Sequence, residues 1–142
     1  LIETYFELYP GVRKYMEKSI ADARKSGYAV TMLGRRRTLR DINSRNATAR
    51  QAAERDAINT PIQGSAADLI KLAMVRVDRK LKELGMKTKM ILQIHDELLF
   101  DVPVEEVDAV KAIVKDAMEG AMKFDVPLEV SIGTGKNWME AH

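Results

Sequence analysis

The longest regular pattern of apolar residues runs from residue 61 to residue 84. Apolar side chains recur there at steps of three and four, which is typical of one face of an amphipathic helix: Ile62, Ala66, Ile70, Ala73, Val77, Leu81 and Leu84. Thr60 can cap this helix, Pro61 suits its first turn, and Gly85 is a natural end. Because proline lacks a backbone N–H, Pro61 also predicts a break from the helix that composition indicates over residues 46–58.

Two more helices and five strands complete the predicted elements. The helices cover residues 12–25, which end at Gly27, and residues 104–121, whose acidic first turn suits the helix dipole. Strands are predicted where β-branched or alternating apolar residues lie between turn residues: 28–33, 38–42, 89–94, 97–102 and 128–132. The fold class is therefore α+β, with an antiparallel sheet that includes a tight hairpin and packs against long helices.

The composition of the 142 residues predicts a folded domain without membrane spans. Hydrophobic residues make up 46% and charged residues 31%, a balance that disfavours disorder. No apolar run approaches the roughly 20 residues that cross a bilayer, and no signal peptide is recognisable. The absence of cysteine excludes a disulfide framework and favours a reducing, cytoplasmic location. Because the chain does not begin with Met, we expect it to be part of a longer protein.

The net charge of +2 divides unevenly along the chain. Residues 1–60 carry 12 Lys or Arg and 7 Asp or Glu, a net charge of +5, whereas residues 61–142 carry 11 and 14, a net charge of −3. The basic part contains a run of arginines without lysine: Arg35, Arg36, Arg37, Arg40, Arg45, Arg50 and Arg55. Arginine suits bidentate contacts to phosphate, so the run indicates a polyanion such as nucleic acid, with a solvated surface as the ordinary alternative.

The tight hairpin carries the stretch QIHDELLFDV, residues 93–102. His95, Asp96 and Glu97 stand in a row there between apolar residues, and burying such charges without partners would be costly. Adjacent carboxylates repel each other, so a nearby cation favours the ionised form of both. Mg²⁺ accepts one or two carboxylates together with substrate phosphates. Each residue alone has an ordinary explanation in a turn, but together they predict a Mg²⁺ site that needs at least one more carboxylate.

A second candidate site is the stretch INTPIQGSAADLIK, residues 58–71, beside the expected break between helices. Its small residues, 64–67, have poor helix propensity at the glycine but allow another backbone to approach. The amide side chains of Asn59 and Gln63 can donate hydrogen bonds to acceptors in a DNA minor groove. The alternative is a capped helix entry in which Gln63 is an ordinary surface residue.

These stretches together resemble a known family. QIHDELLFDV resembles the third polymerase motif of family A DNA polymerases. Three further stretches resemble successive blocks of the same enzymes, in the same order: GYAVTMLGRRRTLRDINSRN, ERDAINTPIQGSAADLIKLAM and DVPLEVSIGTGKNWMEAH. The resemblance covers essentially the whole chain and implies a right-hand-shaped polymerase. Residues 1–60 would supply the end of the fingers with a DNA-contacting hairpin and helix, and residues 61–142 would form part of the palm, within one truncated structural unit.

The resemblance implies template-directed DNA synthesis, in which a primer 3′-hydroxyl attacks the α-phosphate of a dNTP and pyrophosphate leaves. A site with two Mg²⁺ ions would support this reaction. Asp96 would ligate metal, Glu97 would be the second acid at the metal site, and His95 would lie by the primer terminus without ligating. The implied contacts to primer–template DNA are in two groups: Arg55, Asn59 and Gln63 at the minor groove near the new base pair, and Arg35, Arg36 and Arg37 at backbone phosphates.

Two parts of the family pattern are not found in these residues. One is the first motif, a strand with the other essential aspartate, and the other is the fingers helix that grips the triphosphate. We therefore expect the second metal-binding carboxylate to lie outside this chain and the isolated chain not to polymerise. We also expect exposed apolar surface where missing strands would pack and, through that surface, self-association.

Two other functions fit parts of the same pattern. A metal-dependent phosphohydrolase could use His95, Asp96 and Glu97, but it predicts more His or Asp ligands. His142, at the terminus, is the only other histidine. A non-catalytic nucleic-acid-binding domain predicts salt-sensitive DNA binding that does not depend on Asp96.

Overall fold

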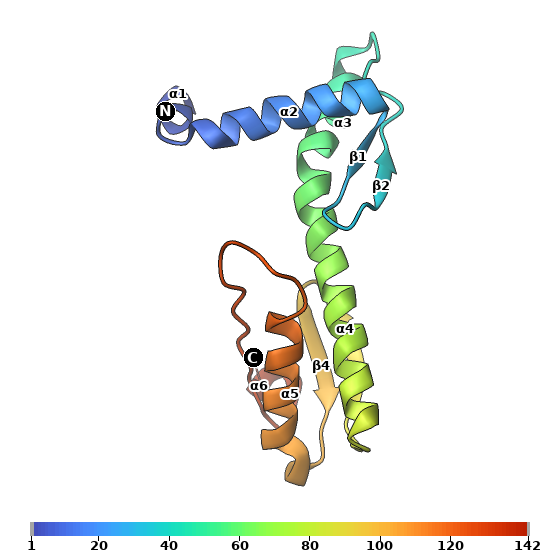
Figure 1. Ribbon diagram of the computed structural model, residues 1–142, viewed down its shortest axis with the longest axis vertical. Helices are drawn as coiled ribbons and strands as arrows, with labels where there is room; N and C mark the ends of the chain where they lie inside the picture. Colours follow the sequence, from blue (N-terminus) through green and yellow to red (C-terminus); the bar gives the residue numbers. More distant parts are fainter. Residues whose placement is uncertain (1, 142) are drawn as a thin grey trace. The chain divides into compact units, whose positions relative to one another are not determined.

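The computed structural model describes residues 2–141, and the chain forms two compact units that divide between Asp68 and Leu69 (Figure 1). The elements in chain order are α1 (Ile2–Leu8), α2 (Pro10–Ser26), β1 (Tyr28–Val30), β2 (Arg36–Thr38), α3 (Ala47–Asn59), η1 (Thr60–Gly64), α4 (Ser65–Glu83), β3 (Lys89–Ile94), β4 (Glu97–Asp101), η2 (Val104–Glu106), α5 (Val107–Glu119) and α6 (Trp138–Ala141). Here η1 is a π-helical turn and η2 a 3-10 turn. Helices combined with antiparallel strand pairs confirm the predicted α+β class.

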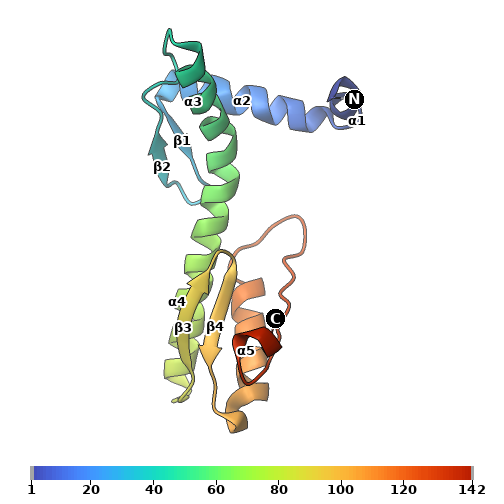
Figure 2. The same cartoon turned by 180° about the vertical axis from the view of Figure 1, so that it is seen from behind.

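The first unit packs α2 and α3 with the hairpin β1–β2 (Figure 2). Tyr28 pairs with Thr38, and Val30 pairs with Arg36, across the two antiparallel strands. The buried core comes from the helices, the hairpin and the loop that follows it: Ala23, Ala29, Leu39, Ile42, Ala53 and Ala57. Alanines at the helix contact allow the helix axes to approach closely, so this unit excludes water although its strands are short.

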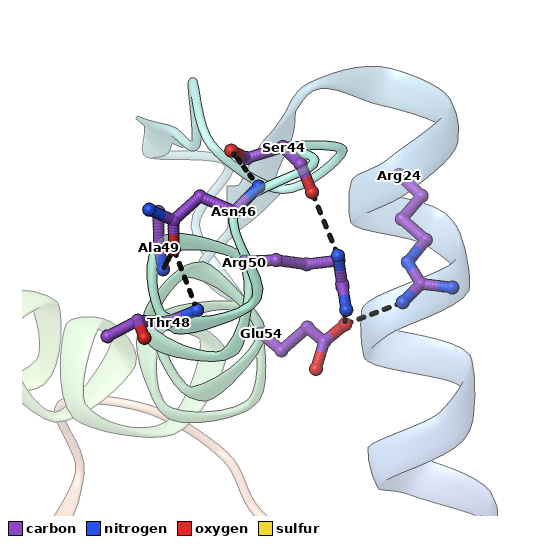
Figure 3. A network of polar contacts seen from close by, with 7 residues as sticks. All are labelled: Arg24, Ser44, Asn46, Thr48, Ala49, Arg50 and Glu54. Atoms are coloured by element: carbon purple, nitrogen blue, oxygen red, sulfur yellow. Dashed lines mark hydrogen bonds and ion pairs between the residues drawn. The ribbon is translucent and has the colours of Figure 1, made fainter.

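The start of α3 is fixed by a side-chain cap (Figure 3). One side-chain oxygen of Asn46 accepts hydrogen bonds from the backbone N–H groups of Thr48 at 2.9 Å and Ala49 at 3.2 Å. These are two of the N–H groups that a helix leaves without an internal partner at its first turn. The predicted helix over residues 46–58 is thus confirmed to within one residue at each end.

A polar network holds α3 against α2 in the same region (Figure 3). Glu54 on α3 accepts a hydrogen bond from the guanidinium of Arg24 on α2 at 2.5 Å, and it lies 3.8 Å from Nε of Arg50. Arg50 also donates from Nη1 to the carbonyl oxygen of Ser44 at 2.9 Å. The network therefore ties the loop before α3, the helix itself and α2 together.

Pro61 does not break the helix, so the predicted break and the predicted Thr60 cap are both wrong. Helical residues follow one another without a gap from α3 through η1 into α4. Thr60 is buried and has helical dihedral angles, φ −59° and ψ −43°. Proline cannot donate the hydrogen bond of a regular turn, and the wider π turn accommodates that gap in the bonding pattern. Nearby, the hydroxyl of Tyr15 donates to the carbonyl oxygen of Ile58 at 2.8 Å.

The second unit packs the hairpin β3–β4 on α5 and on the part of α4 that follows Asp68. The buried core consists of residues from the two helices: Val77, Leu81, Val110, Val114 and Ala117. Met90 on β3 and Phe100 on β4 are partly buried against it. The predicted apolar stripe of α4 is buried at Ile70, Ala73, Val77 and Leu81, but its end members are exposed: Ile62, Ala66 and Leu84.

The approach to β3 is anchored by the carboxylate of Glu106. It accepts hydrogen bonds from the hydroxyl of Thr88 at 2.6 Å, from the backbone N–H of Lys87 at 2.8 Å and from that of Thr88 at 2.9 Å. The hydroxyl of Thr88 is the largest cause that lowers the pKa of Glu106 below its usual value, and the backbone N–H of Lys87 comes next. The ionised carboxylate thus fastens the end of the 3-10 turn η2 to the chain before β3.

The second strand of the first hairpin is Arg36–Thr38 instead of the predicted 38–42. Leu39 and Ile42 are both buried, which requires a turn because residues three apart in a strand face opposite sides. The backbone N–H of Ile42 donates to the carbonyl oxygen of Leu39 at 3.2 Å, and that of Leu39 donates to the carbonyl oxygen of Gly27 at 2.9 Å. The apolar residues after β2 therefore fill the core from a turn.

The predicted strand over residues 128–132 does not form, and the strands make two separate hairpins instead of one sheet. A strand requires a neighbour for its backbone donors and acceptors. At Val130 the backbone N–H instead donates to a carboxylate oxygen of Glu119 at 3.0 Å. Alternation of apolar residues alone was therefore not sufficient to predict a strand there.

Apolar side chains are exposed at many positions, as the sequence predicted. On β3 the exposed fraction is 56% for Ile91 and 47% for Leu92, and Met139 near the end of the chain is 93% exposed. The proposed consequence, self-association, stays a prediction. Among residues 2–141, no helix is both long enough and apolar enough to cross a membrane.

Candidate functional site

The acidic hairpin tip is formed by a two-residue loop between β3 and β4. Ile94 pairs with Glu97, so His95 and Asp96 alone connect the strands. His95 has a φ of +52°, the left-handed conformation that tight two-residue hairpin loops require at their first position. Histidine adopts this conformation more often than most residues, although less easily than glycine. A positive φ at a non-glycine residue is uncommon, and such residues cluster at functional sites.

All three predicted residues of the tip are exposed, as expected for charged groups at a turn. His95, Asp96 and Glu97 lie on the surface, whereas Leu98 and Leu99 behind them are partly buried. The side-chain amide of Gln93 donates to the carbonyl oxygen of His95 at 2.7 Å. This bond ties the loop to β3. The backbone of the turn therefore determines where the two carboxylates lie.

The donor set at the tip fits part of a Mg²⁺ site. Asp96 and Glu97 provide the oxygen ligands that Mg²⁺ prefers, and one or two carboxylates suffice when phosphates complete the coordination. Within residues 2–141, no three His, Asp or Glu side chains come together in a way that could hold a metal ion. His95 therefore does not form a three-residue ligand set with its two neighbours among these residues, and its implied role beside the primer end stays a prediction. His142 lies outside the described residues.

The three residues expected at the minor groove are exposed and spaced by four. Arg55 and Asn59 lie on α3 and Gln63 lies in η1, and a spacing of four places neighbouring side chains on one side of a helix. Turns of π-helix occur frequently at functional sites because they change the direction of side chains relative to a regular helix. The sequence predicted Asn59 and Gln63 beside a helix break, whereas the helix continues through both residues.

The arginine run separates into three different environments. Nε of Arg35 lies 2.7 Å from Oδ1 of Asp68, and Nη2 of Arg37 lies 2.8 Å from Oδ2 of Asp56. The guanidinium of Arg36 lies over the ring of Tyr28, 5.6 Å from its centroid. Sequence reasoning missed both aspartate partners, because they lie 33 and 19 residues away along the chain. The available signal was Asp68 itself, an acid in the otherwise small or apolar stretch Ser65–Ile70.

The small residues after Pro61 accommodate another part of the chain, as predicted, and that part is the start of the connection between β1 and β2. A Cβ atom added to Gly64 would lie 2.6 Å from Cγ2 of Thr31, so only glycine fits there without a shift. The hydroxyl of Ser65 accepts a hydrogen bond from the backbone N–H of Met32 at 2.8 Å and donates to the carbonyl oxygen of Pro61. The hairpin and the π turn are thus in direct contact.

The comparisons with known proteins decide the family. The family model for DNA polymerase family A matches residues 1–140. The chain belongs to DNA polymerase family A. This family generally uses a divalent metal ion, and the membership does not favour the phosphohydrolase alternative.

Named relatives are similar over nearly the whole chain. DNA polymerase I of Lactococcus lactis subsp. cremoris is 54% identical over 140 residues, which are 99% of this chain and 16% of that protein. DNA polymerase I of Mycobacterium bovis is 51% identical over 137 residues, which are 96% of this chain and 15% of that protein. The chain therefore spans about one sixth of the length of the family A relatives that it matches.

A solved structure of the same family has the same fold. The POL domain of Pol1 from M. smegmatis, in complex with DNA primer-template and dNTP, matches with a TM-score of 0.96 and 48% sequence identity. The match covers 99% of this chain and 25% of that chain.

Proposed function

We propose that the chain is part of a DNA polymerase that performs template-directed DNA synthesis. The observation that carries the proposal is the pair of exposed carboxylates, Asp96 and Glu97, at the tip of a tight hairpin in a family A chain. The reaction transfers a nucleotide from a dNTP to the primer 3′-hydroxyl and releases pyrophosphate. Primer–template DNA and dNTP are the partners named for the similar M. smegmatis domain.

In this proposal, Asp96 and Glu97 hold a Mg²⁺ ion together with ligands that this chain does not supply. A bound divalent ion provides Lewis-acid stabilisation of charge on phosphate oxygens and favours the ionised form of the attacking hydroxyl. The chain's own contribution is positional: the two-residue loop presents both carboxylates at one exposed turn. His95 stands beside them at the first loop position, where it would orient the primer end.

The basic side chains would bind the primer–template. Asn59 and Gln63 would donate to acceptors in the minor groove, where the positions shared by all base pairs permit a check of shape without a readout of sequence. Arg55 would assist them, since its side chain is exposed and has no ion-pair or hydrogen-bond partner within the described part of the chain. Arg35, Arg36 and Arg37 would contact backbone phosphates.

The proposal assigns residues 1–60 to the end of the fingers and residues 61–142 to the palm. It includes two expectations that follow from the missing carboxylate: the second metal ligand is supplied from outside this chain, and the isolated chain does not polymerise. An enzyme that extends chromosomal DNA in a bacterium works in the cytoplasm, which is the location that we propose. The exposed apolar side chains support an interface with further protein, whether other parts of the polymerase or a second copy.

The test replaces Asp96 by Ala in the full-length protein that contains this chain. Primer extension is expected to fall at least about a hundredfold, whereas affinity for primer–template DNA is expected to change little. Asp101→Ala is the matched control, since Asp101 is an exposed aspartate at the end of β4 that lies away from the tip. Extension by Asp96→Ala at the unsubstituted rate would refute the proposal, and would leave a DNA-binding domain as the better explanation.

A further inference from the structure

Asp68 is a buried carboxylate that the proposed reaction does not use. Its exposed fraction is 3%, and an ionised group at such a position requires hydrogen-bond partners to offset its loss of hydration. Oδ2 accepts a hydrogen bond from the hydroxyl of Thr31 at 2.6 Å, and Oδ1 accepts one from Nε of Arg35 at 2.7 Å. Both partners come from the chain that connects β1 to β2.

The connection between β1 and β2 is itself closed by hydrogen bonds. The backbone N–H of Thr31 donates to the carbonyl oxygen of Arg35 at 2.9 Å, and the backbone N–H of Arg35 donates to the hydroxyl of Thr31 at 3.2 Å. Gly34 has a φ of +83° and donates to the carbonyl oxygen of Thr31 at 2.9 Å. The backbone of Arg35 is therefore bonded to Thr31, whose hydroxyl is itself bonded to Asp68. This connection does not involve the side chain of Arg35.

Asp68 holds Arg35 through one nitrogen of the guanidinium, and this determines which N–H donors remain available for a phosphate. A guanidinium has five N–H donors, one on Nε and four on the two terminal nitrogens. Asp68 takes the donor on Nε, and the Arg35 side chain is 58% exposed. Among residues 2–141, its terminal nitrogens make no hydrogen bond. The fork that suits bidentate contact with phosphate is therefore left open to solvent.

Arg37 provides the contrast within the same run. It is equally exposed, at 55%, but its contacts use the terminal nitrogens: Nη2 with Asp56 at 2.8 Å and Nη1 with Thr60 at 3.5 Å. A phosphate that approaches these terminal nitrogens would therefore compete with Asp56 and Thr60. The two arginines thus differ in which nitrogens are engaged, although their side chains are exposed to a similar extent.

We propose that Asp68 is a positioning residue for DNA binding: it holds Arg35 by Nε from the protein interior, so that the terminal nitrogens are presented to a backbone phosphate of the primer–template. The inference rests on the proposed function and adds to it. A fixed side chain loses less conformational entropy on binding than a free arginine does. An acid beside a phosphate contact would otherwise weaken DNA binding by charge alone.

The test compares charge with position in the full-length protein that contains this chain. Affinity for a primer–template duplex is measured by fluorescence anisotropy at several salt concentrations between about 50 and 200 mM, where each lost phosphate contact reduces the logarithmic salt slope by about 0.9. Asp68→Asn removes a negative charge, so charge alone predicts tighter binding. The positioning role predicts about tenfold weaker binding and the reduced slope. Arg35→Gln is expected to give the same loss, and the double variant no further loss.

Two more variants make the outcome decisive. Asp56→Asn is the matched control, because it removes the aspartate that pairs with Arg37 and does not release Arg35. This variant is expected to bind DNA as tightly as the unsubstituted protein or more tightly. Asp68→Asn removes a buried carboxylate, so it could fail to melt cooperatively. Arg35→Lys then provides the test, because it keeps the charge at an exposed position and is expected to fold. Its single ammonium group would pair with Asp68 and leave nothing for phosphate, so the slope is expected to fall as in Arg35→Gln.

The proposal is overturned if Asp68→Asn or Arg35→Lys keeps the full slope, if Arg35→Gln binds normally, or if the losses in the double variant add. These outcomes are separate from the proposed function. Asp96→Ala tests the reaction, and its result does not depend on how Arg35 is held.

Discussion

The two hairpins of this molecule hold their polar side chains in different ways. In β1–β2 the arginines are fixed by carboxylates from helical residues, Asp68 for Arg35 and Asp56 for Arg37. In β3–β4 the acidic tip is fixed by its own backbone, through a two-residue loop and the bond from Gln93. Long side chains have many conformations and need partners to restrict them, whereas a short carboxylate is directed by the turn on which it stands. The basic surface therefore depends on packing, and the acidic tip on local geometry.

If packing positions the β1–β2 hairpin, a side chain added at Gly64 should disturb that packing, and this is the largest loss of stability that we expect. Gly64→Ala is expected to lower the free energy of unfolding by about 1–2 kcal/mol, since the new Cβ would lie 2.6 Å from Cγ2 of Thr31, a stiff side chain held by Asp68. The measurement is urea unfolding followed by circular dichroism.

Thr31→Ser provides the matched rescue for that change, because serine lacks Cγ2 but keeps the hydroxyl that donates to Asp68. The double variant with Gly64→Ala is expected to recover most of the lost stability. A double variant that is as unstable as Gly64→Ala would show that the contact between Gly64 and Thr31 is not the cause.

If local geometry positions the acidic tip, glycine at residue 95 should preserve the turn. A residue with a side chain pays about 1 kcal/mol for a φ near +52°, and glycine does not, so His95→Gly is expected to be at least as stable as the unsubstituted protein. Primer extension by the full-length variant is nevertheless expected to fall, because the imidazole is lost. His95→Ala serves as the comparison, since it removes the imidazole but retains the backbone cost. A marked loss of stability in His95→Gly would contradict the proposed origin of the tip's geometry.

The smallest expected effect is on the pH dependence of the second unit. The pKa of Glu106 is lowered in the folded state, chiefly by the hydroxyl of Thr88, so the ionised form stabilises the fold above the ordinary pKa of about 4.5. This contribution is lost as the pH falls through the lowered folded-state pKa. Thermal unfolding measured across the acidic range should therefore depend less on pH in Glu106→Gln than in the control, Glu105→Gln. Equal pH profiles for the two variants would rule out this role.

The sequence by itself determined the features that depend on neighbours along the chain. Periodicity located the long helices, and the spacing of QIHDELLFDV located the tip with Asp96 and Glu97 exposed at the turn, because helices and tight hairpins satisfy their backbone hydrogen bonds locally. The same stretches were sufficient to indicate the family. The Asn46 cap is also local, since its partners lie two and three residues away.

The tertiary structure decided what depends on partners distant in the chain. It joined Asp68 to Arg35 across 33 residues, continued the helix through Pro61 as a π turn, and placed Leu39 and Ile42 in the core from a turn instead of a strand. Residues 128–132 have strand-like alternation, but no strand among residues 2–141 pairs with them, so no strand forms there. In each case the outcome depended on which hydrogen-bond partner or apolar surface the folded chain placed nearby.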